Sequence, residues 1–184
     1  PPLLLPAPCR VQRLLERAYE SALPRQAESK LWFGGATSLA CLQEGLQRYP
    51  ESTYGEILIE GVRRLAACTD LGEGDTLVDL GSGLGRCTVQ VFMETPVARA
   101  VGVELDPDRH LGAVAVMRRA LQGRLQLRAS ASGDGNSCGD LLAGTAACWR
   151  DAAGRRLEFW CSDAVCAWHA WRTASVVFCS SLCF

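Results

Sequence analysis

The chain has 184 residues, a formal net charge of −1 and 48% hydrophobic residues. This length fits one globular domain, and the apolar content excludes an intrinsically disordered chain. The near-zero charge lacks the basic excess that is typical of nucleic-acid binding, and no apolar run approaches the roughly 18 residues of a membrane-spanning helix.

Ten cysteines are present, but none of them form a Cys-x-x-Cys pair. Cys87 and Cys161 lie in or beside apolar runs, where cysteine behaves as a small hydrophobic residue. His110 and His169 have no cysteine pair near them at zinc-ligand spacing. We therefore expect reduced thiols and no metal, and not the disulfide framework of a small secreted chain.

The amino-terminal third predicts helices without recognisable chemistry. Residues 9–30 carry apolar residues at helical intervals among Arg and Glu, which predicts an amphipathic helix. Thr37 or Ser38 can cap a second helix over residues 39–46. We expect residues 1–50 to form a small helical segment that packs against a sheet domain or covers its ligand.

The functional argument rests on residues 76–86, where an apolar strand runs into a glycine turn. Asp79 interrupts the apolar run, and because a carboxylate is costly to bury unpaired, we expect it to face a ligand or N–H donors. Glycines let the backbone approach a ligand closely, and the following helix start offers free N–H groups. Open α/β sheets bind nucleotide-like ligands in this way. Three glycines stand at alternate positions: Gly81, Gly83 and Gly85.

A second predicted strand, residues 98–105, ends at Glu104, where a carboxylate can accept two hydrogen bonds from a ribose diol. In the nicotinamide-dinucleotide fingerprint the third glycine comes three places after the second. Here Gly85 comes two places after, and Arg86 takes the expected position. The spacing resembles the adenosylmethionine motif of class I methyltransferases. A nicotinamide enzyme and a purely structural turn are the alternatives.

Beyond the second strand, Asp106 and Pro107 predict a helix start, as cap and first-turn proline, and the helix continues to Leu121. Residues 124–128 alternate in polarity and form either a short strand or a frayed helix end. Residues 129–155 are rich in Ala, Gly, Ser and Asp without a clear period, so we expect a surface loop insertion.

Residues 157–161 predict a third strand, residues 168–171 a short helix or turn, and residues 174–179 a fourth strand. Alternating strands and helices predict an α/β fold with a mostly parallel sheet and helices on both faces. Class I methyltransferase sheets have the strand order 3-2-1-4-5-7-6. Only strands 1 to 4 can be assigned before Phe184, and the sequence lacks an initial Met. We therefore expect a truncated domain over residues 51–184, with an unpaired edge that favours self-association.

These segments together resemble the disruptor-of-telomeric-silencing family, the histone lysine methyltransferases that use a class I, Rossmann-like fold instead of a SET domain. The likeness covers roughly residues 51–184. The sequence Tyr-Gly-Glu is the segment that picks out this family, because the glycine loop and the second strand identify only the superfamily. Four segments carry the likeness in the same order: residues 54–56, 78–85, 101–104 and 176–184.

The resemblance implies S-adenosyl-L-methionine as cofactor, and a nuclear enzyme that methylates a protein lysine in a histone or nucleosome. On this pattern Glu104 binds the ribose hydroxyls, while Asp163 and Ala164 flank the adenine. Tyr54, Gly55 and Glu56 cover the methionine part. The amino-acid and ribose portions are lined by Asp79, Gly81, Ser82, Gly83, Leu84, Gly85 and Arg86.

The resemblance also implies a channel for the substrate lysine, with Tyr54, Ser180, Ser181 and Phe184 as candidates. An apolar or hydroxyl-lined channel lowers the pKa of the lysine and yields the neutral amine that transfer requires. No residue stands out as a general base. Ser180 and Ser181 replace two asparagines of the family. A methyltransferase for another protein or a small molecule, and a non-catalytic adenosylmethionine-binding fold, are therefore the alternatives.

Overall fold

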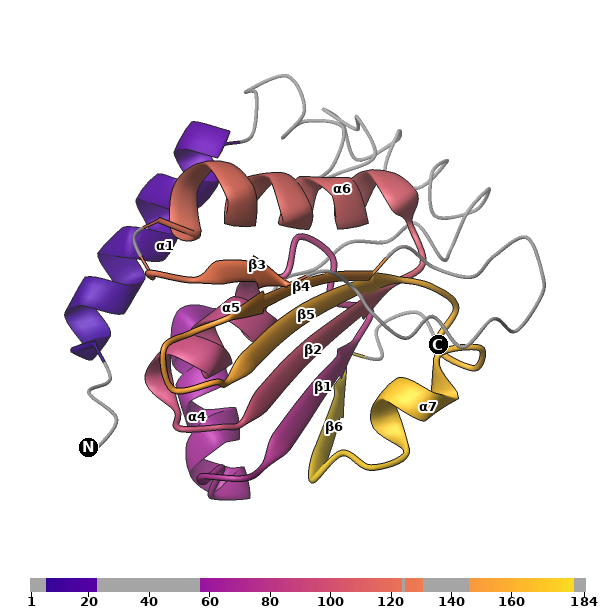
Figure 1. The fold of residues 1–184 in the computed structure, drawn as a ribbon. Helices are drawn as coiled ribbons and strands as arrows, with labels where there is room; N and C mark the ends of the chain where they lie inside the picture. Colours follow the sequence, from indigo (N-terminus) through magenta and orange to yellow (C-terminus); the bar gives the residue numbers. More distant parts are fainter. Residues whose placement is uncertain (1–5, 23–56, 124, 131–145, 181–184) are drawn as a thin grey trace, which may run out of the picture.

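The computed structural model describes residues 6–22, 57–123, 125–130 and 146–180, and every structural statement below concerns these residues. Its centre is a six-stranded sheet (Figure 1). The strands are β1 (Thr76–Leu80), β2 (Arg99–Glu104), β3 (Arg128–Ser130), β4 (Ala146–Arg150), β5 (Arg156–Cys161) and β6 (Val176–Cys179). Their order across the sheet is β3-β4-β5-β2-β1-β6.

The four strands predicted from the sequence are confirmed, and they lie side by side in the predicted order, as β5-β2-β1-β6. All three pairings among them are parallel. Parallel strands place their carboxyl ends at one edge of the sheet, so the segments that follow β1, β2, β5 and β6 gather at that edge.

The expectation of a loop over residues 129–155 is wrong in part, because β3 and β4 lie at its ends and extend the sheet by antiparallel pairing. Trp149 of β4 is 1% exposed and packs edge-on against Phe159 of β5. Trp149 therefore holds β4 against the sheet, although the small residues of this stretch show no hydrophobic periodicity that predicts a strand. Residues 124–128 are compatible by sequence with a short strand or a frayed helix end, and in the structure the strand begins only at Arg128, after a turn in which Gln126 has a φ of 53°.

One face of the sheet carries four α-helices, and the other carries one short helix (Figure 1). On the first face lie α1 (Pro8–Ala22), α4 (Ile59–Thr69), α5 (Arg86–Glu94) and α6 (Pro107–Val116), which continues as the π-helical turn η2 (Met117–Leu121). The opposite face carries α7 (Trp168–Trp171). Helices on both faces are therefore confirmed. None of the described helices is long and apolar enough to cross a membrane.

The predicted start of α6 is also confirmed, since the Asp106 side chain accepts hydrogen bonds from the amides of Asp108 and Arg109. The acceptor satisfies two of the four helix amides that have no partner within the helix. This cap directs α6 back across the sheet immediately after β2.

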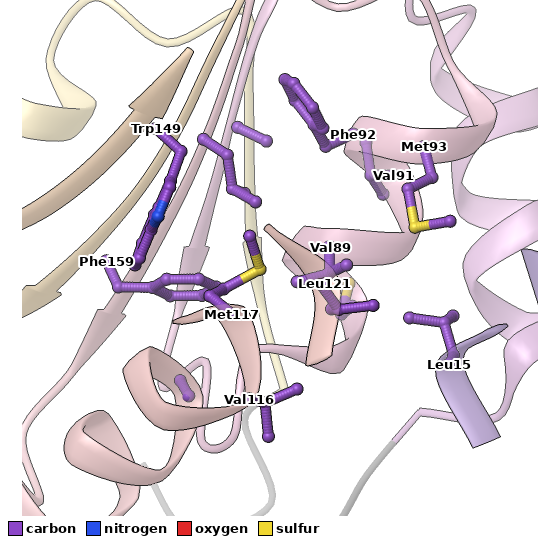
Figure 2. Packing of buried hydrophobic residues seen from close by; sticks show 14 of the residues in the cluster. Leu15, Val89, Val91, Phe92, Met93, Val116, Met117, Leu121, Trp149 and Phe159 are labelled. Atoms are coloured by element: carbon purple, nitrogen blue, oxygen red, sulfur yellow. The ribbon is translucent and has the colours of Figure 1, made fainter. Parts of the chain in front are cut away.

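The main core lies between the sheet and the four-helix face. Figure 2 shows side chains of α5, η2, β4 and β5 together, with Leu15 of α1 directed toward them. Val11, Leu15, Ala18 and Tyr19 of α1 are at most 3% exposed and belong to this core. The amino-terminal helix thus packs against the sheet domain, one of its two expected roles. The boundary near residue 50 stays a prediction.

Candidate functional site

The glycine loop crosses the carboxyl end of β2. The amides of Gly81 and Ser82 both donate to the carbonyl of Val103, at 2.8 and 3.0 Å. These bonds continue the β1–β2 pairing, in which Leu80 faces Val103. The loop therefore lies directly beside the last residue of β2, Glu104.

Glu104 binds the loop through its side chain and is only 6% exposed. One carboxylate oxygen accepts the Gly83 amide proton at an N–O distance of 2.6 Å, and the other accepts that of Asp106 at 2.8 Å. A carboxylate has about four acceptor positions, so two remain for further donors such as hydroxyls. The structure thus brings together two predicted site residues, Glu104 and Gly83.

Two glycines allow this close packing. Gly85 has a φ of 79°, and a Cβ there would collide with the Phe159 ring, reaching its Cζ at 2.6 Å. A Cβ on Gly102 would approach the Ser82 hydroxyl oxygen to 2.7 Å. Gly85 was predicted to be needed for the loop. Gly102, on the strand beneath the loop, was not singled out, because a glycine inside a strand gives no sign of what packs on it.

Asp79 is 3% exposed and contacts Thr88 of α5. The Thr88 hydroxyl donates to its Oδ2 at 3.1 Å. The sequence predicts a ligand or N–H donors as partners of Asp79, and the donor in the structure is instead a side-chain hydroxyl. Burial raises the pKa of Asp79 to about 7, and the nearby negative charge of Glu104 adds to that rise, against the lowering effect of the Thr88 hydrogen bond. A buried carboxyl group in this state is suited to a cationic ligand group.

Sequence reasoning missed Tyr19, which reaches the loop from α1. Its hydroxyl donates to the carbonyl oxygen of Leu84 at 2.9 Å, and its ring lies 4.4 Å from the guanidinium carbon of Arg86. The helical spacing of α1 predicted a buried face. It gave no sign that one residue of that face contacts a loop that lies 65 positions further along the chain.

The segment after β5 lies beside Glu104, because the Ser162 amide donates to the Glu104 carbonyl at 2.9 Å. Asp163 accepts the Val165 amide proton at 2.7 Å, and the Ala164 carbonyl accepts the indole N–H of Trp171. These bonds fix the turn that leads into α7. Asp163 and Ala164, predicted on the adenine side, are thus held at the same sheet edge as Glu104.

Residues 38–125 match the family model described as histone methylation protein DOT1. These residues form a DOT1-family segment. It includes the glycine loop, Asp79, Glu104 and the Tyr-Gly-Glu sequence, and it ends before β3. The parallel order β5-β2-β1-β6, the glycine loop and the two strand-end carboxylates agree with a Rossmann-like methyltransferase fold. The family resemblance and the fold class predicted from the sequence are confirmed.

Five predicted site residues fall outside the residues that the structure describes, and a sixth, Ser180, lies at their limit. Tyr54, Gly55 and Glu56 precede the described part of the DOT1 segment, and Ser181 and Phe184 follow the described residues. Ser180 is exposed and follows β6 directly, at the edge where Cys179 pairs with Leu80. It therefore stands at the same sheet edge as Asp79.

Proposed function

We propose that this chain belongs to an S-adenosyl-L-methionine-dependent histone-lysine N-methyltransferase that acts in the nucleus. The observation that carries the proposal is the bond between Glu104 and the Gly83 amide, made within a segment that matches the DOT1 family. A glycine loop held against a strand-end carboxylate is the arrangement that binds a nucleoside-containing cofactor.

The described residues fit such a cofactor. Glu104 keeps acceptor capacity for the two ribose hydroxyls after its two backbone bonds. Asp79 lies buried at the end of the neighbouring strand and is positioned to balance a cationic amino-acid portion. When bound, the cofactor supplies a methyl group that is already activated on a sulfonium. The remaining task of the protein is to align the acceptor and exclude water.

The acceptor amine must be neutral, so the protein has to lower the pKa of the substrate lysine by removing it from water. Ser180, beside the end of β1, supports a hydroxyl-lined entrance at this edge. Tyr54, Ser181 and Phe184 are proposed as its other walls. The family match supports a histone as the substrate class, and a nucleosome as the larger partner.

Methyl transfer from radiolabelled S-adenosyl-L-methionine tests this proposal, with nucleosomes, free histones and a histone-depleted cell extract as acceptors. Labelled lysine in histones is the expected result. Label found only on proteins of the depleted extract would contradict the histone assignment and support a methyltransferase for another protein.

A thermal-shift measurement separates binding from transfer. S-adenosylhomocysteine is expected to raise the melting temperature, while NADH is the matched control and leaves it unchanged. A shift without transfer to any acceptor supports a non-catalytic binding fold, which the replacement of two family asparagines by Ser180 and Ser181 favours as the second candidate. A shift with NADH alone would contradict both.

A further inference from the structure

We propose that Tyr19 is a positioning residue for the glycine loop, so that helix α1 is a working part of the cofactor site. The inference rests on the proposed function and extends it, because α1 precedes residues 38–125, the segment that matches the family. No residue of the glycine motif and neither of the strand-end carboxylates belongs to this helix.

The contact is buried at both ends. Tyr19 is 1% exposed and Leu84 is fully buried, and the hydroxyl–carbonyl distance of 2.9 Å is that of a good hydrogen bond. The tyrosine ring also lies against the guanidinium of Arg86, the first residue of α5. Tyr19 therefore contacts the loop on each side of Gly85.

The hydrogen bond acts on a backbone unit that lies between two glycines. Leu84 stands between Gly83 and Gly85, and glycine, which lacks a Cβ, restricts rotation of the flanking peptide planes less than other residues do. The Leu84 carbonyl and the Gly85 amide belong to one rigid peptide plane. Tyr19 holds the carbonyl end of that plane, while the Ser82 carbonyl accepts the amide end at 2.8 Å.

This plane is hydrogen-bonded to the peptide unit on which the proposed cofactor site depends. The Gly85 amide donates to the Ser82 carbonyl, and the Gly83 amide of that same unit, two peptide units earlier, donates to the Glu104 carboxylate. A rotated Leu84–Gly85 plane would change the direction of the loop amides relative to Glu104. The Tyr19 hydroxyl selects one orientation of the plane, so the loop keeps its geometry before a ligand binds.

Helix α1 can impose this geometry because it is itself firmly held. Val11, Leu15 and Ala18, on the same face as Tyr19, are at most 3% exposed and belong to the main core. Figure 2 shows Leu15 directed toward the side chains of α5 and η2. The hydroxyl is thus carried by a helix with a fixed position and not by a freely moving segment.

Tyr19→Phe tests the inference, because it removes the hydroxyl and keeps the buried ring. We expect the dissociation constant of S-adenosylhomocysteine, measured by calorimetry at 25 °C, to rise about three- to tenfold, the worth of one hydrogen bond. Hydrogen exchange of the Gly83 and Gly85 amides in the ligand-free protein is expected to become faster.

Val97→Ala is the matched control. Val97 is fully buried before β2, at the sheet edge opposite the loop, so its truncation lowers overall stability without touching the site. Both variants are measured at a temperature where they are fully folded. A mutation that only lowers the free energy of unfolding then leaves the dissociation constant unchanged. We expect normal affinity and normal loop exchange in Val97→Ala.

Unchanged affinity and unchanged loop exchange in Tyr19→Phe would overturn the inference, as would equal changes in both variants. A wild-type protein that binds no S-adenosylhomocysteine would instead count against the proposed function. In that case the exchange of the Gly83 and Gly85 amides in the ligand-free protein still decides the role of Tyr19.

Discussion

The carboxylate of Glu104 and the amide of Gly83 lie 2.6 Å apart, which joins the last residue of β2 to the middle of the glycine loop. The sequence predicts one role for Glu104, which is to bind the ribose hydroxyls of the cofactor. The structure adds a second role, because the same carboxylate accepts hydrogen bonds from the backbone amides of Gly83 and Asp106. One residue thus supports both the loop and the proposed ribose site.

Glu104→Ala is therefore expected to lower the free energy of unfolding by about 3 kcal/mol, as two hydrogen bonds to a charged acceptor are lost. Urea denaturation measures this change. Calorimetry on the folded fraction is expected to show at least about a hundredfold weaker binding of S-adenosylhomocysteine. Full stability together with full affinity would remove Glu104 from both roles.

The raised pKa of Asp79 predicts a pH dependence of stability. With a folded-state pKa of about 7, the native protein holds a proton that the unfolded chain, with an ordinary carboxyl pKa, has already released. Stability then falls as pH rises through 7, by roughly 1 kcal/mol between pH 6.5 and 8. Burial lowers the pKa of His110, so unfolding takes up a proton there until the pH passes the ordinary histidine pKa, and this effect partly opposes the loss at the lower end of the range.

Asp79→Asn tests this origin, because the amide keeps the shape of the carboxyl group and does not titrate. Denaturation between pH 6.5 and 8 is expected to show a smaller loss of stability in Asp79→Asn than in the wild type. Equal slopes in the two proteins would show that Asp79 does not hold the proton.

Gly85→Ala is expected to destabilise the protein more than Gly74→Ala, and the pair separates two causes. Both glycines have positive φ, at 79° and 91°, so an alanine strains the backbone at each. Only at Gly85 would the new Cβ meet the Phe159 ring, since nothing lies within 4 Å at Gly74. We expect Gly85→Ala to cost about 1–3 kcal/mol more, as in overpacked cores. Equal melting temperatures would contradict this packing.

The ion pair between Arg99 and Glu158 is expected to matter more than the exposed pair of Arg63 with Glu60. Glu158 is 6% exposed and accepts two bonds from Arg99, at 2.7 and 3.0 Å. Removing one partner of a buried pair costs about 3–5 kcal/mol, whereas exposed pairs contribute about 0–1 kcal/mol. Unfolding of Glu158→Ala and the control Glu60→Ala compares them, and similar small losses would contradict the difference.

The loss of stability at low pH provides a second test of the Arg99–Glu158 ion pair. Burial alone raises the pKa of Glu158, but the hydrogen bond and charge of Arg99 outweigh it and leave the pKa below its usual value. The stabilisation is therefore present above the ordinary carboxyl range and is lost as pH falls through the lowered pKa. Glu158→Gln is expected to weaken this acid dependence.

The parallel strands were predictable because each is a short apolar run between turn signals. Their order followed from the class I resemblance, and the glycine loop and Glu104 followed from spacing. The strands β3 and β4 were not predictable in the same way. Their position depends on the contact between Trp149 of β4 and Phe159 of β5. The surrounding small residues show no hydrophobic periodicity from which this contact could be predicted.

Within the candidate site, sequence reasoning found the residues that act through their own segment and missed those that act from a distance. Gly102 is required because the Ser82 side chain packs directly on it. Tyr19 matters because its hydroxyl donates a hydrogen bond to the Leu84 carbonyl. Each is a pairwise contact created by the tertiary structure. Periodicity identifies a buried face, but it does not identify the atom that this face contacts.

The distance along the chain between Tyr19 and Leu84 has a consequence for synthesis on the ribosome. At about 5–20 residues per second, the 65 residues that follow Tyr19 up to and including Leu84 take roughly 3–13 s to be made. A helix of 15 residues is only marginally stable alone in water. During that interval α5, α6 and η2, which contact α1 in the folded protein, have not yet been made. The apolar residues of α1 that are buried in the folded protein are therefore made several seconds before these helices. We expect chaperones that bind exposed apolar segments to act on the nascent chain during this interval.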